Sequence, residues 1–206
     1  MKLYVADRAP GPLVAKRLFA AKNIDVDFHV VDMNNKENRS PEFLKLNPTG
    51  QIPFLQLDDG QIIAEVTAIA EYLEELKPDP VLVGATAAER ANTRMWMRRV
   101  DIAVIWPMGM GFQHGNGAGF FAGRIPIHED ISAPAQAIAS EGMQWLDAQL
   151  AGNAFICGND PRFVDIVFYG FASFFAKVSQ PVDPELVNLS AYMQRMSEHP
   201  FITSVK

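Results

Sequence analysis

Residues 47–55 constrain the fold more than any other stretch of the chain. Their sequence is Asn-Pro-Thr-Gly-Gln-Ile-Pro-Phe-Leu, a run of turn-forming residues followed by an apolar segment. Because proline has no N–H to donate to a sheet, Pro53 must lie at the start of a strand or on an edge. The backbone of Ile52 is then left unpaired, and an extended peptide can dock against such a backbone as an added strand. The alternative is a plain loop that enters a strand.

Composition and charge limit the class of protein. A chain of 206 residues can form one large domain or two small ones. No apolar run approaches the roughly 18 residues needed to cross a bilayer. The net charge of −6 and the pI near 5.2 argue against nucleic acid or an anionic membrane as partner. The early charges of residues 1–8 do not suit a signal peptide, and the single cysteine, Cys157, excludes an internal disulfide. We therefore expect a cytoplasmic protein.

The first 77 residues predict a compact α/β unit. Strands are expected at residues 2–6 and 26–31, and a hairpin at residues 54–63 around Asp59-Gly60. Helices are expected from residue 13 onward, at residues 41–46 with Ser40 as N-cap, and from Glu65 onward. Tyr4 lies within the first strand and is expected in the core. The order is βαβαββα.

The remainder predicts an all-helical domain. Pro78 and Pro80 end the first unit, so we place a linker at residues 78–88 and a helical domain at residues 89–206. Helical periodicity covers residues 87–112, 129–150, 163–178 and 184–197, and Pro107 should kink or end the first of these helices. The glycine-rich residues 114–123 follow a helix and lack a phosphate-binding ending, so we expect a mobile loop. The histidines are scattered, and no metal is predicted.

Two segments resemble the cytosolic glutathione S-transferase family, bacterial type: residues 39–53, and residues 64–73 with Glu65 at the head of a helix. The resemblance implies a thioredoxin-like first domain, a cis Pro53 and pairing of the Ile52 backbone with the cysteinyl residue of glutathione. Ala9 and Gln51 are also expected to contact glutathione. Glu65 and the following helix would hold its γ-glutamyl end. Val66 replaces the family's hydroxyl residue, a loss of about 0.5–1.5 kcal/mol.

The catalytic side chain of the family is missing. Family members place a Tyr, Ser or Cys near the end of the first strand, and these positions fall on Ala9, Pro10 and Gly11. We hypothesise that Arg8 and the Gly11 N–H lower the pKa of the thiol instead. The alternative for Arg8 is a solvated turn residue. Farther along, Arg162 replaces the family's helix cap before Asp165, which should cost about 1 kcal/mol.

The second substrate is expected between the domains, against an apolar wall. Candidates are Trp106, Met110 and Phe112, although such residues also suit the core of the helical domain or a dimer face. The resulting prediction is a homodimeric detoxification enzyme that conjugates glutathione, its co-substrate, to a small hydrophobic electrophile. The alternatives are a non-catalytic binding or regulatory protein of the same fold, and a glutathione-dependent lyase or isomerase.

Overall fold

The computed structural model describes residues 1–7 and 9–205, which form two compact units. The first unit contains residues 1–85 together with the C-terminal residues 199–205, and the second contains residues 86–198. Arg8 lies outside the described residues.

The first unit has the predicted βαβαββα order around a four-stranded sheet. The strand order is β2-β1-β3-β4, with β1 parallel to β2 and antiparallel to β3, and with β3 antiparallel to β4. The elements are β1 (Lys2–Val5), α1 (Pro10–Lys22), β2 (Asp27–Val30), η1 (Glu37–Arg39), α2 (Pro41–Leu46), β3 (Phe54–Gln56), β4 (Ile62–Ala64), α3 (Val66–Leu76) and, from the C-terminus, α10 (Pro200–Thr203). The expected thioredoxin-like α/β arrangement is therefore confirmed.

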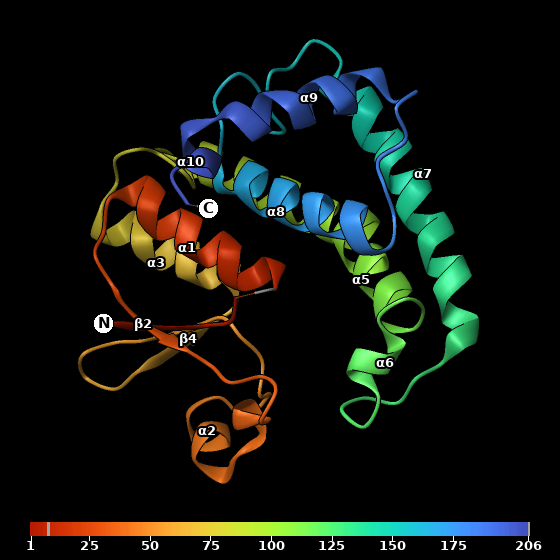
Figure 1. Ribbon diagram of the computed structural model, residues 1–206. Coiled ribbons are helices and arrows are strands. Elements are labelled where there is room, and N and C mark those ends of the chain that lie inside the picture. Colours follow the sequence, from red (N-terminus) through yellow and green to blue (C-terminus); the bar gives the residue numbers. More distant parts are fainter. Residues whose placement is uncertain (8, 206) are drawn as a thin grey trace. The chain divides into compact units, whose positions relative to one another are not determined.

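The two faces of this sheet carry different helices. Leu3 and Val5 are fully buried on one face, and α1 and α3 lie side by side over the sheet while α2 lies on the opposite side (Figure 1). Under α2, the ring of Tyr4 stacks on Phe54 with centroids 4.2 Å apart, and Phe43 of α2 meets Phe54 edge-on at 5.4 Å. Tyr4 is 8% exposed, which confirms it as a core residue.

Local turn and cap signals in this unit are confirmed. The Ser40 hydroxyl accepts the N–H of Phe43 and caps α2 as predicted. The β3–β4 hairpin closes through Leu57 N–H to Gln61 O at 2.9 Å, with Gly60 at a φ of 90°. A positive φ of this size suits glycine, which explains the Asp-Gly step.

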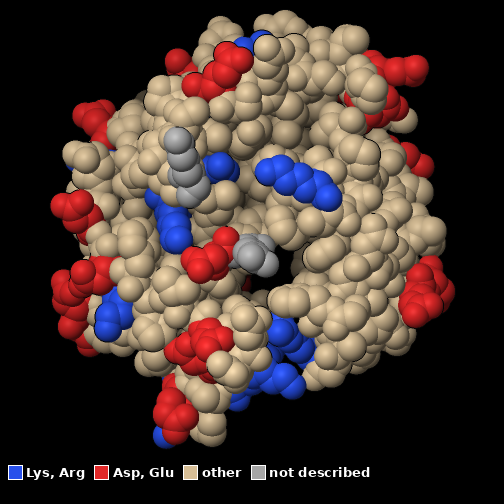
Figure 2. All heavy atoms as spheres, in the orientation of Figure 1, with Lys and Arg blue, Asp and Glu red and all other residues tan. Residues whose placement is uncertain are grey.

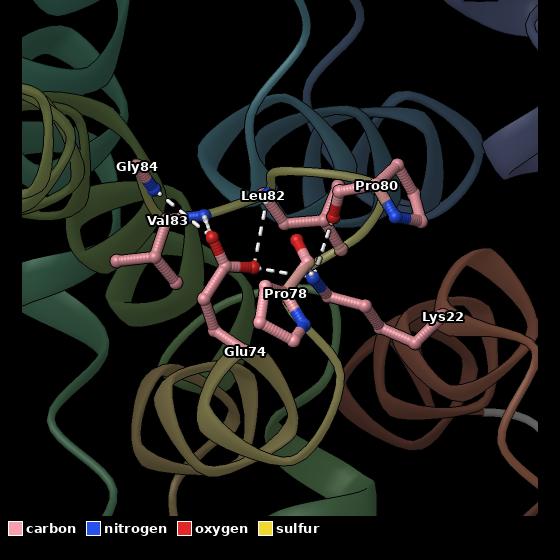
Figure 3. Close-up of polar contacts among 7 residues, drawn as sticks. All are labelled: Lys22, Glu74, Pro78, Pro80, Leu82, Val83 and Gly84. Atoms are coloured by element: carbon pink, nitrogen blue, oxygen red, sulfur yellow. Dashed lines mark hydrogen bonds and ion pairs between the residues drawn. The ribbon is translucent and has the colours of Figure 1, made fainter. Parts of the chain in front are cut away.

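A buried ion pair fastens the segment after α3 onto the first unit (Figure 3). Lys22 of α1 is 0% exposed and Glu74 of α3 is 3% exposed. The Lys22 ammonium also donates to two main-chain carbonyls, those of Pro78 and Pro80. The Glu74 carboxylate accepts three successive backbone N–H groups at 3.0–3.1 Å, those of Leu82, Val83 and Gly84. The Asp79-Pro80 peptide bond in this segment is cis.

The second unit is helical, as predicted. Its elements are α4 (Ala87–Val100), η2 (Asp101–Ile105), α5 (Trp106–Gln113), α6 (Ala118–Phe121), η3 (Glu129–Ile131), α7 (Ser132–Leu150), α8 (Phe163–Val178) and α9 (Val187–Glu198). Most residues of the first half of α8 are buried, so this helix lies in the core of the unit.

Pro107 changes the helix without ending it. Residues 101–105 form a π-helical turn that joins α4 to α5. Pro107 has no N–H to offer the carbonyl of Ala103, so an ordinary helical bond is missing here. That carbonyl packs against Gly142 of α7: a Cβ added to Gly142 would lie 2.0 Å from the Ala103 oxygen. The expected stop is therefore absent, because α5 continues past Pro107 after a widened turn.

The glycine-rich segment contains a helical turn, so the prediction of a loop is wrong for α6. The ring of Phe121, from α6, packs edge-on against Phe112 with centroids 6.0 Å apart. This apolar contact compensates for the poor helix propensity of the surrounding glycines.

Asp165 holds the beginning of α8 from inside the helix. Its carboxylate accepts the N–H of Arg162 at 2.7 Å and that of Ile156 at 3.0 Å. Arginine has no side-chain acceptor, so Arg162 cannot return the bond in the way a serine or threonine cap does. As predicted, the Asp165 half of the capping box is present, and the acceptor of a serine or threonine cap is missing.

The described residues contain no helix that could span a membrane, and the surface charges on the face in Figure 2 are of mixed sign. In the described residues, no helix is both long and apolar enough to cross a membrane. On the face in Figure 2, the basic side chains stand in small groups separated by acidic and uncharged ones.

Candidate functional site

Three segments of the first unit meet at one end of the sheet. In the β1–β3 ladder Tyr4 pairs with Phe54, and in the β3–β4 ladder Phe54 pairs with Ala64. The chain leaving β1, the chain entering β3 and the chain leaving β4 therefore lie next to one another. This register brings the segment of Gln51, Ile52 and Pro53 next to Glu65 and Val66, and the chain that leads from β1 to Ala9 and Gly11 leaves the sheet at the same end.

The loop before β3 is held by hydrogen bonds to its carbonyl groups. Asn47 Nδ2 donates to Gln51 O at 2.8 Å, Asn38 Nδ2 to Gly50 O at 2.8 Å, and Arg39 Nη1 to Thr49 O at 3.1 Å. Sequence reasoning missed Asn38 and Arg39. The structure explains their role through Gly50, whose φ of 63° puts the loop backbone against η1.

Ile52 follows this loop with an unpaired backbone. Among the described residues, its N–H and C=O make no hydrogen bond. The Ile52–Pro53 peptide bond is cis, as the resemblance implies. The Ile52 side chain packs on the aromatic cluster below α2, and Pro53 is buried. A fixed strand end with free main-chain groups can pair with an extended peptide.

The N-terminus of α1 lacks a capping side chain. Pro10 is the first helical residue, Ala9 is the N-cap and the first turn contains no acidic residue. The N–H of Leu13 donates to Ala9 O at 3.5 Å, so Gly11 supplies the helix's first donor without an intrahelical acceptor. The helix dipole adds positive potential at this point.

The N-terminus of α3 is also open. Glu65 is its N-cap, with an exposed side chain and a φ of 71°, which is unusual for a residue other than glycine. The first intrahelical bond runs from Ile69 N–H to Glu65 O, so the preceding N–H groups remain available to an anion. Val66 offers no hydroxyl. Thr67, which sequence reasoning did not single out, brings one to the next position of the same turn.

The candidate apolar wall lies on α5 in the second unit. Trp106 is 65% exposed and Met110, one helical turn later, is partly exposed. Phe112 belongs instead to an aromatic cluster, with its ring 5.8 Å from that of Phe174 and 5.9 Å from that of Phe175. Trp106 and Met110 can therefore form one face, while Phe112 supports the helix behind it.

The helical unit contains further titratable groups and a groove. Burial raises the pKa of the Cys157 thiol to about 12, so this cysteine does not supply a thiolate nucleophile near neutral pH. Within the described residues, His, Cys, Asp and Glu form no group of three or more placed to hold a metal ion. A groove of about 430 Å³ between α8 and α9 is lined by Tyr169, Lys177 and Met193, among others, and by none of the predicted site residues.

Comparison with known families gives two matches along the chain. The profile described as "Glutathione S-transferase, N-terminal domain" matches residues 17–76, and the one described as "Glutathione S-transferase, C-terminal domain" matches residues 100–195.

Individual proteins give the same result. Glutathione S-transferase 2 from Saccharomyces cerevisiae is 29% identical over 204 residues, covering 98% of this chain and 88% of that protein. The crystal structure of Gtt2 from Saccharomyces cerevisiae superposes with a TM-score of 0.92 at 29% identity, covering 99% of both chains. Maleylacetoacetate isomerase from Pseudomonas aeruginosa is 36% identical over 96 residues, which is 46% of this chain and 45% of that enzyme.

Proposed function

Because the chain belongs to the glutathione S-transferase family, we propose that it is a glutathione transferase acting on a small hydrophobic electrophile. The observation that carries this proposal is the unpaired backbone of Ile52, which lies at the same sheet end as the first turns of α1 and α3. Such an end offers an extended anionic peptide both a strand partner and unpaired N–H groups.

The tripeptide is proposed to bind along this end of the sheet. The Ile52 backbone pairs with its cysteinyl residue, while Ala9, Gln51 and Pro53 flank the peptide. The N-terminus of α3 takes the γ-glutamyl carboxylate, and the exposed carboxylate of Glu65 takes its ammonium group. Since Val66 lacks a hydroxyl, the binding of this end depends mainly on backbone donors.

The thiol is proposed to be activated by charge and backbone. The Gly11 N–H and the positive end of α1 favour a thiolate, and Arg8 adds a cation next to α1 in the sequence. The thiolate sulfur then attacks the electrophilic carbon. One S–C bond forms, and a leaving group such as chloride departs with the electron pair of its bond to that carbon.

The electrophile is proposed to pack on α5. Trp106 and Met110 supply an apolar face, and Phe112 fixes that helix from its aromatic cluster. We expect Trp106→Ala to raise KM for the electrophile while leaving the affinity for glutathione unchanged.

Binding and thiol ionisation test the proposal. Calorimetric titration should detect glutathione binding, and the thiolate absorbance of bound glutathione should report a pKa below that of the free tripeptide. Arg8→Ala should reverse part of that shift, whereas Arg98→Ala, on an exposed residue of α4, should not. Turnover of a nitro-activated aryl chloride completes the assay. Binding with an unshifted thiol pKa and no turnover would favour the non-catalytic alternative.

A glutathione-dependent isomerase is a second candidate, because of the partial match to maleylacetoacetate isomerase. In such a reaction the thiolate adds to the substrate and is released again, so no glutathione is consumed. Following glutathione concentration during turnover of an α,β-unsaturated acid distinguishes isomerisation from conjugation.

We further propose that the protein is a cytoplasmic homodimer. Met95 of α4 and Ile102 of η2 stand seven residues apart on one continuous helix and are 39% and 53% exposed. Exposed apolar residues at this spacing suit a subunit interface. Ile102→Glu should then halve the mass measured by light scattering, and cell fractionation tests the location.

A further inference from the structure

A contact between a histidine and a carboxylate joins the edge strand β2 to η1, the element that holds the loop before Ile52. His29 of β2 and Glu37 of η1 meet with Nε2 2.6 Å from Oε1, and the two side chains are 40% and 35% exposed. The His29 ring is placed by Tyr4 of β1, its partner in the sheet register, with ring centroids 4.8 Å apart. Protonation of an imidazole turns such a contact into a charge-assisted hydrogen bond, which is stronger than the neutral one.

Glu37 links this contact to the turn before η1. Its second carboxylate oxygen accepts the N–H of Asp32 at 2.7 Å, and its own N–H donates to Asp32 O at 3.0 Å. The Asp32 N–H and, to a smaller extent, His29 hold the pKa of Glu37 below its usual value. The Asp32 carboxylate is occupied within the same turn, where it accepts from Asn34 and Asn35. Glu37 therefore ties both β2 and the turn to the start of η1.

The next two residues of η1 hold the loop itself. Asn38 is 3% exposed and donates to Gly50 O, and Arg39 donates to Thr49 O. The loop has little room to shift, since a Cβ on Gly50 would lie 2.7 Å from the Asn38 carbonyl oxygen. A displacement of η1 is thus passed to the main chain directly before Ile52.

We propose that His29 and Glu37 are positioning residues for the glutathione site, which tighten binding when the imidazole is protonated. The inference rests on the proposed function, because it assigns glutathione to Ile52. Among the described residues, the titratable groups next to the pair are Tyr4, whose ring contacts His29, and Asp32, whose negative charge acts on Glu37 in the direction opposite to the charge of His29. The hydrogen bonds that link His29 and Glu37 to the loop before Ile52 all join residues of the first unit.

The affinity for S-methylglutathione, whose sulfur cannot ionise, measures the effect without interference from the thiol. Wild-type protein should bind about threefold more tightly near pH 5.5 than near pH 8, the factor expected for a partly exposed ion pair. His29→Gln and Glu37→Gln should each remove this dependence, and the double variant should match the single ones. His128→Gln and Glu42→Gln, the matched controls, should keep the wild-type profile. Unchanged profiles in the single variants, or additive losses in the double variant, would overturn the pairing.

Amide spectra of the unliganded protein separate this inference from the proposed function. The Thr49, Gly50 and Ile52 amide resonances should shift with pH in the wild type, following the His29 ring, and should stop doing so in Glu37→Gln. Static loop resonances would overturn the inference even if glutathione binds. If the loop resonances shift but S-methylglutathione does not bind, the assignment of the site to glutathione is overturned, and with it the role in binding.

Discussion

Removing the charge of Glu74 should destabilise the protein more than removing almost any surface charge. Glu74→Gln leaves the Lys22 ammonium buried without its counter-ion, because Lys22 is 0% exposed and its other acceptors are two carbonyls. Breaking a buried ion pair in this way typically costs about 3–5 kcal/mol. The side-chain amide also cannot accept all three N–H groups that the carboxylate accepts now.

The same contact predicts a pH dependence. Burial disfavours the charged carboxylate of Glu74 and tends to raise its pKa. The hydrogen bonds from the Lys22 ammonium and the three backbone N–H groups have a larger opposite effect, so the pKa of Glu74 is lowered. Because the pKa of Glu74 is lower in the folded state, its contribution to the free energy of unfolding is fully present above the unfolded pKa of about 4.3. This contribution is lost as the pH falls through the folded pKa. Glu74→Gln should abolish this part of the acid sensitivity.

Urea unfolding and hydrogen exchange measure the two effects. We expect the free energy of unfolding to fall by about 3–5 kcal/mol in Glu74→Gln, and the amides of Leu82, Val83 and Gly84 to lose protection first. Glu75→Gln, an exposed neighbour on α3, should stay within about 0.5 kcal/mol of wild type.

A double variant distinguishes this network from an isolated ion pair. Replacing both charges with apolar residues is often neutral for a simple buried pair. In Lys22→Met/Glu74→Leu the N–H groups of Leu82, Val83 and Gly84 lose their acceptor, and each buried unsatisfied donor costs about 1–3 kcal/mol. The double variant should therefore remain destabilised by several kcal/mol. Recovery to within about 1 kcal/mol of wild type would refute the reasoning.

Three further substitutions test other parts of the structure. Gly142→Ala should lower the free energy of unfolding by about 1–3 kcal/mol, because its Cβ would overlap the Ala103 carbonyl, whereas Gly109→Ala, 3.9 Å from Phe175, should be tolerated; urea unfolding compares them. Gly50→Ala should weaken glutathione binding about tenfold in calorimetry, through its left-handed φ and its contact with Asn38, while Gly60→Ala should leave binding intact. Burial raises the pKa of Asp165 to about 6, so its contribution to stability falls as pH rises from about 4 to 6. The stability difference between wild type and Asp165→Asn should accordingly be larger near pH 4.5 than near pH 7, measured by unfolding at both values.

Features set by local sequence were predictable. Ser40, Pro53 and Gly60 act through their own backbone or hydroxyl, and each appears where the sequence places it. Features set by distant residues were not. Lys22 and Glu74 are 52 residues apart, so nothing near either one indicates that they meet. The π turn before Pro107 likewise packs closely against Gly142, which belongs to another helix.

The candidate site follows from local sequence in outline, because the groups proposed for it are mostly backbone groups. Ile52 and Gly11 are proposed to act through main-chain atoms, whose positions follow from a proline and a helix start. Backbone donors cannot be strengthened by a change of side chain, so affinity in such a site depends on how firmly the loop is held. That function falls to Asn38 and Arg39, whose contacts with the loop span about a dozen residues and leave no mark in local sequence. For the proposed site, we therefore expect the side chains that control binding to lie in η1 and β2, one layer away from the ligand.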